Sequence, residues 1–253
     1  MAASETRWSG RALLRPGVGA FAGNVGDNKT HQHWAHQVSI GLDSDVVVAV
    51  AGNLLRGPAV FVPAGEAHQL MQGKVIAIYV DPTSTWAKTL AASTGTDGHA
   101  SMLAGNWIDD LRRHFLQSGC VNACVDQFED QFKDSFCAPT DARMALVLDT
   151  LQSGVRDLSI RVDREVLAKL TGVSGSRFSH WFSGQTGMPF RSYRKWLRLV
   201  HGLELALAGD GLTDAAHRSG FADQAYFTRT FVELFGIAPS RLLADIERQA
   251  GKE

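Results

Sequence analysis

The sequence is poor in cysteine and has no long apolar run. Its 253 residues include three cysteines, Cys120, Cys124 and Cys137, and no two have the C-x-x-C spacing of a zinc site or redox pair. We therefore expect reduced thiols without a disulfide framework. The longest apolar run, near Val46–Ala51, is far shorter than the roughly 18 residues of a membrane helix. The first ten residues also lack the apolar core of a signal peptide, so we expect a cytoplasmic protein without membrane attachment.

Several patterns of catalysis and nucleotide binding are also missing. There is no Ser-His-Asp order, phosphate-cradling glycine loop or dinucleotide fingerprint, because Gly17-Val18-Gly19 does not continue into one. The composition, with 45% hydrophobic and 20% charged residues, is that of a globular protein. A chain of 253 residues favours two small domains.

The net charge of −1 hides an asymmetry along the chain. Residues 1–140 contain 10 Lys and Arg against 13 Asp and Glu, whereas residues 141–253 contain 15 against 13. The basic excess is largest in residues 156–209, which have 9 basic and 4 acidic side chains. Because a charge run is usually a solvated helix face, this patch alone is weak support for nucleic-acid binding.

The first eighty residues have the pattern of β structure. Short apolar segments at 37–42, 46–51, 59–62 and 75–80 are separated by Gly, Asp, Asn and Pro, which predicts a sandwich or barrel. From about residue 85 the apolar residues follow helical spacing, and we expect helices at 101–117 and 121–134. Pro139 interrupts this pattern, so we expect one domain to end at residue 138 and the next to begin at 139.

The second half is divided into helices by its own start and stop signals. We expect helices at 142–151, 163–170, 174–185, 189–207, 213–219 and 223–235, and a last helix from Pro239 that carries Ile246. The expected N-caps are Asp163, Ser174, Thr213 and Asp223. Twice, a short helix, a turn with glycine and a second helix follow one another, which is the order of a helix-turn-helix motif. The 19-residue connecting helix would span about 28 Å, close to the roughly 34 Å between successive major-groove faces of DNA.

Periodicity alone would equally fit a helical bundle with an interaction role. The residues themselves favour DNA binding, because the stretch from Asp214 to Pro239 resembles the signature of the AraC family of bacterial transcription regulators. Upstream, Leu167-Ala168, Phe178, Pro189-Phe190 and Arg198-Leu199 fall where that family has its first motif and its connecting helix. The resemblance covers roughly residues 141–245.

The resemblance implies a DNA-binding unit of two helix-turn-helix motifs joined by a long helix. The side chains that would contact DNA are Ser176, Arg177, Ser179 and His180 in the first motif, Arg194 and Lys195 in the connecting helix, and Gln224, Ala225, Tyr226, Thr228 and Arg229 in the second motif. Because the first motif offers mostly short side chains, we expect the second to discriminate more between DNA sequences. Two departures from the family pattern, Gly202 and Arg241-Leu242-Leu243, bear on local stability more than on function.

Two further motifs resemble those of the cupin β-barrel. The segment from Gly57 to His68 resembles the second cupin motif, with His68 at the head of a strand and pointing into the barrel. The segment from His31 to Gln37 resembles the first, in which two alternating histidines face one side of a strand. In metal-binding cupins three histidines and a glutamate hold a divalent ion. Here Gln37 stands in place of the glutamate, and an amide is a poorer ligand than a carboxylate.

We therefore expect no metal and no other cofactor in this barrel. Instead, we expect the barrel to bind a small-molecule effector through its polar side chains, which are His31, His33, His36, Gln37 and His68. The helices at 101–117 and 121–134 would pack against the barrel or form a dimer interface.

These observations predict an α+β fold of two domains. Residues 1–138 would form a small cupin-like β-barrel with trailing helices, for effector sensing and dimerisation, and residues 139–253 an all-α domain of the AraC type. We expect a transcription regulator without catalytic activity that acts on double-stranded promoter DNA, with RNA polymerase and a second copy of the chain as further partners. Two alternatives stay open: a metal-dependent cupin enzyme with metal at His31, His33 and His68, and an interaction protein whose helix-turn-helix pairs no longer bind DNA.

Overall fold

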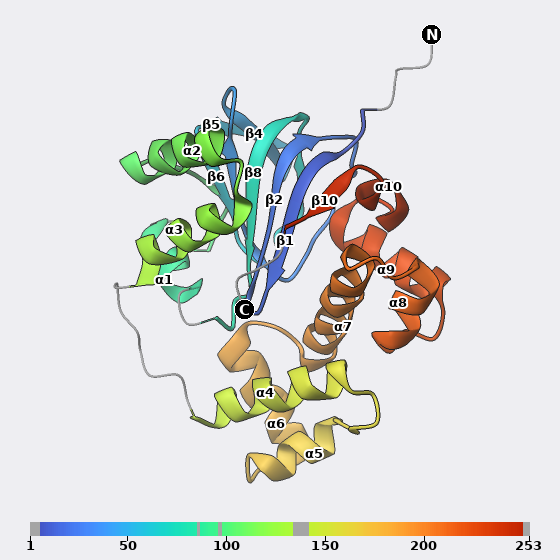
Figure 1. The fold of residues 1–253 in the computed structure, drawn as a ribbon. Helices are drawn as coiled ribbons and strands as arrows, with labels where there is room; N and C mark the ends of the chain where they lie inside the picture. Colours follow the sequence, from blue (N-terminus) through green and yellow to red (C-terminus); the bar gives the residue numbers. More distant parts are fainter. Residues whose placement is uncertain (1–5, 85–86, 96–97, 134–141, 250–253) are drawn as a thin grey trace. The chain divides into compact units, whose positions relative to one another are not determined.

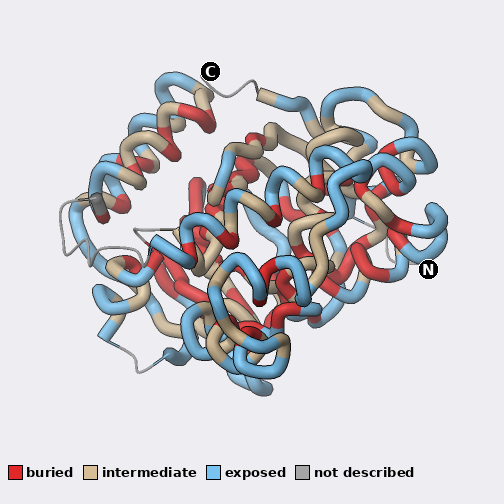
Figure 2. The backbone as a smooth tube through the Cα atoms, turned by 90° about the horizontal axis from the view of Figure 1, so that it is seen from below, coloured by how far each residue is buried: buried red, intermediate tan, exposed pale blue. Residues whose placement is uncertain are grey.

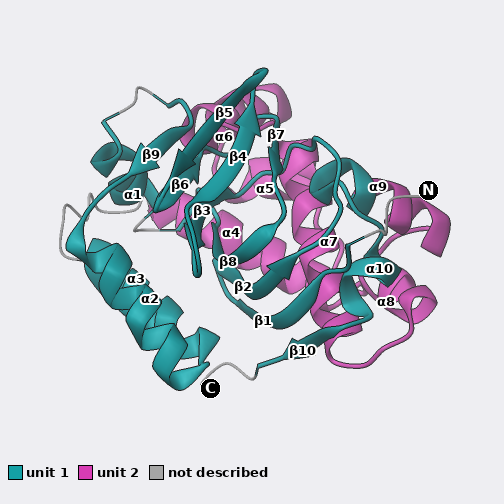
Figure 3. Cartoon of the chain, turned by 90° about the horizontal axis from the view of Figure 1, so that it is seen from above, with its two compact units in different colours: residues 1–137, 231–253 teal, residues 138–230 magenta. Residues whose placement is uncertain are grey.

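A computed structural model describes residues 6–84, 87–95, 98–133 and 142–249. The expected domain boundary near residue 138 and Cys137 lie outside these described residues. The contacts divide the chain into unit 1, residues 1–137 with 231–253, and unit 2, residues 138–230 (Figure 3). The mixed α+β class is confirmed, because the strands of the described residues all lie in unit 1, beside several helices, and the described part of unit 2 is helical (Figure 1).

Unit 1 is built on two β-sheets. The larger sheet has the strand order β10-β1-β2-β8-β3-β6-β9, and the smaller has the order β5-β4-β7. The strands are β1 (Ser9–Arg15), β2 (Val18–Val25), β3 (His36–Gly41), β4 (Val46–Val50), β5 (Asn53–Gly57), β6 (Ala59–Val62), β7 (His68–Leu70), β8 (Gly73–Val80), β9 (Ser101–Leu103) and β10 (Ile246–Arg248). The strand pairs are antiparallel except for β1 with β10, which is parallel.

Strand β8 lies in the middle of the larger sheet and is apolar on both faces. Ile76 and Ile78 belong to a core cluster that includes Leu90, Leu111 and Phe128. These three residues come from the helices of unit 1, α1 (Ala87–Ser93), α2 (Asn106–Ser118) and α3 (Val121–Lys133). Because side chains alternate across a strand, Ala77 and Tyr79 face the other side, where the ring centre of Tyr79 lies 5.3 Å from that of His33.

A two-residue turn joins β4 to β5. Val50 pairs with Asn53 in the register of this hairpin, and the two residues between them, Ala51 and Gly52, have φ of 49° and 80°. A tight hairpin turn of the primed type requires positive φ at both central residues. Alanine rarely adopts this conformation, which is why we expected the strand to continue through Ala51.

Unit 2 consists of helices with buried apolar stripes. Its helices are α4 (Ala142–Arg156), α5 (Arg164–Leu170), α6 (Gly175–Thr186), α7 (Phe190–Leu207) and α8 (Leu212–Arg218), followed by α9 (Gln224–Phe235), which ends in unit 1, and α10 (Pro239–Leu243), which lies there. Buried and exposed positions alternate along the helices at helical spacing (Figure 2). Among the helices of the described residues, none is long and apolar enough to cross a membrane.

The N-caps show where the sequence-based helix starts are right and where one is wrong. The side chains of Asp163, Ser174 and Asp223 accept hydrogen bonds from backbone N–H groups of the first turn, as expected. Thr213 does not cap α8, because this helix begins at Leu212, after Gly211, without a side-chain cap.

Two helix predictions need correction at their ends. The expected helix 101–117 begins only at Asn106, because residues 101–103 form β9, which pairs with β6, and Gly105 then has a φ of 146° that no helix can contain. At the C-terminus, Ile246 is not in the last helix. This helix ends at Leu243, and Ile246 begins β10, which pairs with Gly10 of β1.

Candidate functional site

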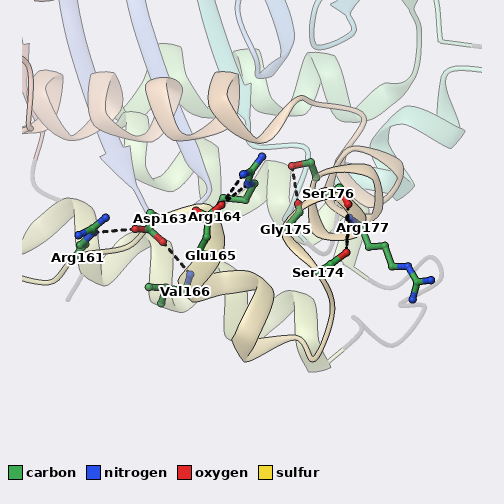
Figure 4. A network of polar contacts seen from close by, with 10 residues as sticks. Arg161, Asp163, Arg164, Glu165, Val166, Ser174, Gly175, Ser176 and Arg177 are labelled. Atoms are coloured by element: carbon green, nitrogen blue, oxygen red, sulfur yellow. Dashed lines mark hydrogen bonds and ion pairs between the residues drawn. The ribbon is translucent and has the colours of Figure 1, made fainter.

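The first helix-turn-helix motif consists of α5 and α6. Oδ1 of Asp163 accepts a hydrogen bond of 3.0 Å from the backbone N–H of Val166 and begins α5. Gly172, with φ of 71°, turns the chain, and the hydroxyl of Ser174 accepts a hydrogen bond from the backbone N–H of Arg177 in α6 (Figure 4). The two helices therefore start and stop at defined residues, which fixes the face that α6 presents.

The exposed face of α6 carries the residues expected to contact DNA. Ser176, Arg177 and His180 are exposed and Ser179 is half-buried, while Phe178 and Phe182 on the other face are fully buried. In Figure 4 the side chain of Arg177 points away from the surrounding polar contacts. Its guanidinium forms no ion pair within the described part of the chain, and such a group at the start of a helix suits contact with a phosphate or a base edge.

Helix α7 connects the two motifs. It has 18 residues, which corresponds to a length of about 27 Å. One side is buried through Tyr193, Trp196 and Leu199, and Arg194 and Lys195 lie half-buried beside these positions. The expected connecting helix is thus confirmed, one residue shorter at its start.

The second motif consists of α8 and α9. Gly220, with φ of 81°, turns the chain, and Oδ1 of Asp223 accepts a hydrogen bond of 2.6 Å from the backbone N–H of Tyr226. The hydroxyl of Thr213 in α8 donates a 2.6 Å hydrogen bond to Oε1 of Gln224, the first residue of α9. This contact links the first helix of the motif to the recognition helix.

The first two turns of α9 expose a polar surface. Gln224, Ala225, Tyr226 and Arg229 are exposed and Thr228 is half-buried. The guanidinium of Arg229 lies 5.9 Å from the centre of the Tyr226 ring, a cation–π distance. The predicted contact residues of the second motif therefore share one face, with the arginine and the tyrosine side by side.

Two residues of this region matter in ways that we did not predict. Thr213 was expected only as a helix cap, and its contact with Gln224 joins residues eleven positions apart, which sequence spacing does not reveal. Gly202 of α7 is required by packing, since a Cβ atom at this position would lie 2.6 Å from Phe227 and 2.8 Å from the hydroxyl of Ser219. A glycine inside a predicted helix was the signal for a close approach.

A second candidate site is a buried polar cluster in unit 1. His31 and His68 exchange two backbone hydrogen bonds of 2.9 Å, and their ring centres are 4.5 Å apart. The ring of His33 lies 4.9 Å from that of His68. Oε1 of Gln37 lies 2.9 Å from Nε2 of His33 and 3.0 Å from Nε2 of His68. We call these four residues, His31, His33, Gln37 and His68, the histidine cluster.

The structure corrects two expectations about this cluster. His36 does not belong to it, because neighbouring residues on a strand face opposite sides. Its ring stacks on Phe61 with 5.5 Å between ring centres, and its Nδ1 accepts a hydrogen bond from the backbone N–H of Ala64. In addition, His31 and His33 are not on a regular strand, because β3 begins only at His36.

Burial keeps the histidines neutral. It lowers the pKa of His31 to about 4, with a further contribution from nearby His68, and it lowers the pKa values of His33 and His68 as well. Burial also lowers the pKa of His36 to about 4. Neutral imidazoles can accept hydrogen bonds or bind metal ions at the nitrogen without a proton.

The end of helix α9 lies against this cluster within unit 1. The ring centre of Phe235 is 5.9 Å from that of His33, and the carbonyl of Gly236 accepts a 2.9 Å hydrogen bond from the backbone N–H of Lys29. A Cβ atom on Gly236 would collide with the carbonyl of Lys29 and lie 2.9 Å from Nδ1 of His31. Glycine at 236 therefore allows the chain to approach the cluster closely.

Comparisons with known proteins fit this architecture. Among curated proteins none matches the sequence. Over its length the chain is similar in fold to solved structures of ToxT from Vibrio cholerae. One, an apo form of a ToxT variant, has a TM-score of 0.60 and 11% identity, over 92% of this chain and 98% of that chain. Another, wild-type ToxT with bound unsaturated fatty acid, has a TM-score of 0.56 and 13% identity, over 94% and 99%.

A family model described as a helix-turn-helix domain matches residues 167–245. The match begins in α5, includes both motifs and the connecting helix, and ends after α10. This is the region in which the sequence resembles AraC-family regulators, and the resemblance is confirmed. The chain therefore carries a helix-turn-helix domain of the AraC type at residues 167–245.

Proposed function

We propose that the chain is a sequence-specific DNA-binding transcription regulator. The observation that carries this proposal is the pair of helix-turn-helix motifs, in each of which the second helix begins at a side-chain cap and presents a polar, exposed face. Helix α7, about 27 Å long, connects them at a spacing suited to neighbouring major-groove segments of one duplex. A regulator of this kind needs no catalytic group, and we assign none.

Base contacts are proposed for residues of α6 and α9. The second motif offers longer hydrogen-bonding side chains, Gln224 and Arg229, than the first, which offers Ser176, Ser179 and His180. Amide and guanidinium groups read adenine and guanine edges in pairs of hydrogen bonds, whereas a serine makes single, less selective contacts. We therefore propose that α9 carries most of the sequence discrimination and that Arg177, Arg194 and Lys195 contact phosphates.

An effector is proposed to bind in unit 1. The ToxT structure with bound unsaturated fatty acid is the precedent for a ligand-binding protein of this fold. In this chain, the histidine cluster is the buried polar group to which a ligand would bind, and Phe235 at the end of α9 contacts it. A ligand that contacts Phe235 would favour one position of this helix end over another, which is how binding shifts a conformational equilibrium.

Further partners belong to the same proposal. One is RNA polymerase, which a regulator that acts in the cytoplasm on promoter DNA would contact. The other is a second copy of this chain, for which helix α2 offers a surface, because Leu116 is exposed while Leu111 is buried. Dimerisation would raise the effective concentration of the second DNA-binding unit at a paired site. Sedimentation of the full chain with and without a Leu116→Glu substitution tests this surface.

The decisive experiment is selection of genomic fragments by the full-length protein. The best fragment and a scrambled control are then titrated at two salt concentrations by fluorescence anisotropy. We expect a preference of about 1,000-fold or more for the selected fragment and affinity that falls with salt. Equal, weak binding to both fragments at each salt concentration would contradict the proposal and favour an interaction protein.

A further inference from the structure

We propose that the effector of this chain is an uncharged molecule with an apolar body and a hydroxyl or amide group, and that this group forms hydrogen bonds with Nε2 of His31 and the hydroxyl of Tyr79. This inference rests on the proposed function, because it takes unit 1 to be the part of the chain that binds an effector. It adds the chemical class of the ligand and a residue, Tyr79, that was not among the effector-binding residues expected from the sequence.

The imidazoles of the histidine cluster each present one hydrogen-bond acceptor. Nδ1 of His31, His33 and His68 lies 2.8, 3.0 and 2.9 Å, respectively, from the backbone carbonyl of a residue two positions away in the sequence. A carbonyl only accepts hydrogen bonds, so each Nδ1 carries a proton. Because burial keeps the rings neutral, each Nε2 keeps its lone pair. The three Nε2 atoms therefore all need donors.

The side-chain amide of Gln37 supplies donors for two of these acceptors. The position of its Oε1 lies 2.9 Å from Nε2 of His33 and 3.0 Å from Nε2 of His68. An amide oxygen cannot donate a hydrogen bond, so we take the amide to be turned over, with its NH2 group between the two rings. The amide oxygen then accepts a hydrogen bond from the hydroxyl of Ser39, at 2.7 Å. In this arrangement the side-chain polar atoms of Gln37, His33 and His68 are all paired without any charge.

Two polar groups beside this network stay open. Nε2 of His31 and the hydroxyl of Tyr79 form no hydrogen bond within the described part of the chain. Both side chains flank the ring of His33, with 5.7 Å between ring centres for His31 and 5.3 Å for Tyr79. Burial raises the pKa of the Tyr79 hydroxyl well above its usual value, so this group keeps its proton. A ligand at this place must offer a donor to His31 and an acceptor to Tyr79, which a hydroxyl or an amide does and an ionised carboxylate does not.

A row of residues across the larger sheet extends from these two groups. Leu14, Gly19, Tyr79 and Gln37 pair in register on the neighbouring strands β1, β2, β8 and β3, so they lie on one face of the sheet. The first three residues are half-buried, whereas Gln37 is fully buried. The ring of Phe235, also half-buried, lies 6.3 Å from that of Tyr79. Apart from the tyrosine hydroxyl, the half-buried part of this row is apolar, which suits the apolar body of a ligand.

The strands around this row offer no charge that could balance an ionised ligand. Strands β2, β3, β6 and β7 contain no Lys, Arg, Asp or Glu. In β8, Lys74 forms an ion pair at the opposite end of the strand from Tyr79. In β1, Arg11 and Arg15 are bound to the carbonyl after α2 and to a carboxylate of α3. An unpaired charge is costly to bury, so this surface favours an uncharged ligand.

The test uses the full-length protein and three probes that share a ten-carbon chain and differ in charge: decanamide, decanoate and decylammonium. Calorimetry at neutral pH, at concentrations below those at which the probes aggregate, gives the affinities, and thermal unfolding is a second readout. We expect saturable binding of decanamide, with an increase in thermal stability, and binding of both charged probes that is weaker by about 10-fold or more. Equal or tighter binding of decanoate or decylammonium, or no saturable binding of decanamide, would overturn the inference.

Tyr79→Phe removes the hydroxyl and keeps the ring, so it should weaken binding of decanamide by about 5-fold or more while the protein stays folded. Tyr226→Phe is the matched control, because Tyr226 is an exposed tyrosine of α9 in unit 2, and it should bind decanamide like the wild type. Unchanged affinity of Tyr79→Phe would show that Tyr79 does not contact the ligand.

The outcomes separate this inference from the proposed function. If decanoate binds and decanamide does not, unit 1 binds an effector of another class, and only the inference is wrong. If no probe binds, the inference is wrong, and titration of the selected DNA fragment still decides whether the chain is a regulator. No DNA enters the measurements with the probes, so neither result depends on the other.

Discussion

The hydroxyl of Thr213 donates a 2.6 Å hydrogen bond to Oε1 of Gln224, so the first helix of the second motif holds the first side chain of the recognition helix. An amide whose oxygen accepts this hydrogen bond keeps its NH2 group as a donor for another partner. A base edge with an acceptor, such as N7 of a purine, is then the favoured partner. If Gln224 reads a base, as proposed, the choice of base then depends also on Thr213, which is not among the proposed DNA contacts.

Thr213→Val should therefore change specificity more than stability. The hydrogen bond is exposed, so we expect its loss to lower the free energy of unfolding by about 1 kcal/mol or less. The freed amide can rotate, and discrimination at one base pair of the operator should decrease. Competition between operator variants measures this change. Unchanged discrimination at each position would show that Gln224 does not read a base. Thr213→Ser, which keeps the hydroxyl, is the control and should bind like the wild type.

Arg229→Ala should weaken binding to the selected DNA by about 1–3 kcal/mol if the guanidinium reads a base. Titration of the selected and the scrambled fragment separates two roles: a base contact weakens only the first, whereas a phosphate contact weakens both equally and reduces the salt dependence. Arg113→Ala is the matched control, because Arg113 is an exposed arginine of α2 in unit 1, and its loss should leave both affinities unchanged.

Gly202→Ala should destabilise unit 2. The added methyl group would lie 2.6 Å from Phe227 and 2.8 Å from the hydroxyl of Ser219, and overpacking of this kind costs about 1–3 kcal/mol. Gly184→Ala in α6 is the control, because a Cβ atom there meets nothing within 4 Å and alanine stabilises helix interiors by about 0.5–1 kcal/mol. Urea denaturation followed by tryptophan fluorescence should give opposite shifts for the two variants. A shift in the same direction would refute this packing argument.

The free energy of unfolding should decrease as the pH falls from about 6.5 toward 4. His36 has its pKa lowered from 6.5 to about 4, so the unfolded chain takes up a proton in this range that the folded chain does not. The neutral histidine therefore does not reduce the free energy of unfolding above pH 6.5. Below that pH the free energy of unfolding declines, by on the order of 2 kcal/mol at pH 5 for one such histidine. Denaturation at pH 7, 6 and 5 measures the loss of stability, and His36→Gln should show a smaller loss. A pH-independent midpoint would contradict the burial of neutral histidines.

The helical half was largely predictable because its signals are local. Asp163, Ser174 and Asp223 cap helices where a short polar side chain precedes an apolar stripe, and Pro189 precedes the long helix directly. Each of these signals involves residues only three or four positions apart, so it can be recognised in the sequence alone. The buried Phe178 and Phe227 follow from the same periodicity.

The rest of the fold depends on long-range pairing, which local patterns do not encode. Ile246 continues an apolar helical pattern, yet it pairs with Gly10 at the other end of the chain. Residues 101–103 likewise extend a helical stripe but form β9 against β6. In the histidine cluster, the residue types were predictable from the sequence. The carbonyls that orient each ring, and the opposite direction of His36, depend on backbone geometry.

The return of residues 231–249 to unit 1 has a consequence for the order in which the protein can fold. The chain leaves unit 1 before residue 138 and re-enters it at 231, where Phe235 contacts His33 and β10 joins the edge of the sheet. Unit 2 is thus inserted within the sequence of unit 1, and β1 cannot complete its pairing with β10 until the C-terminal residues have been synthesised.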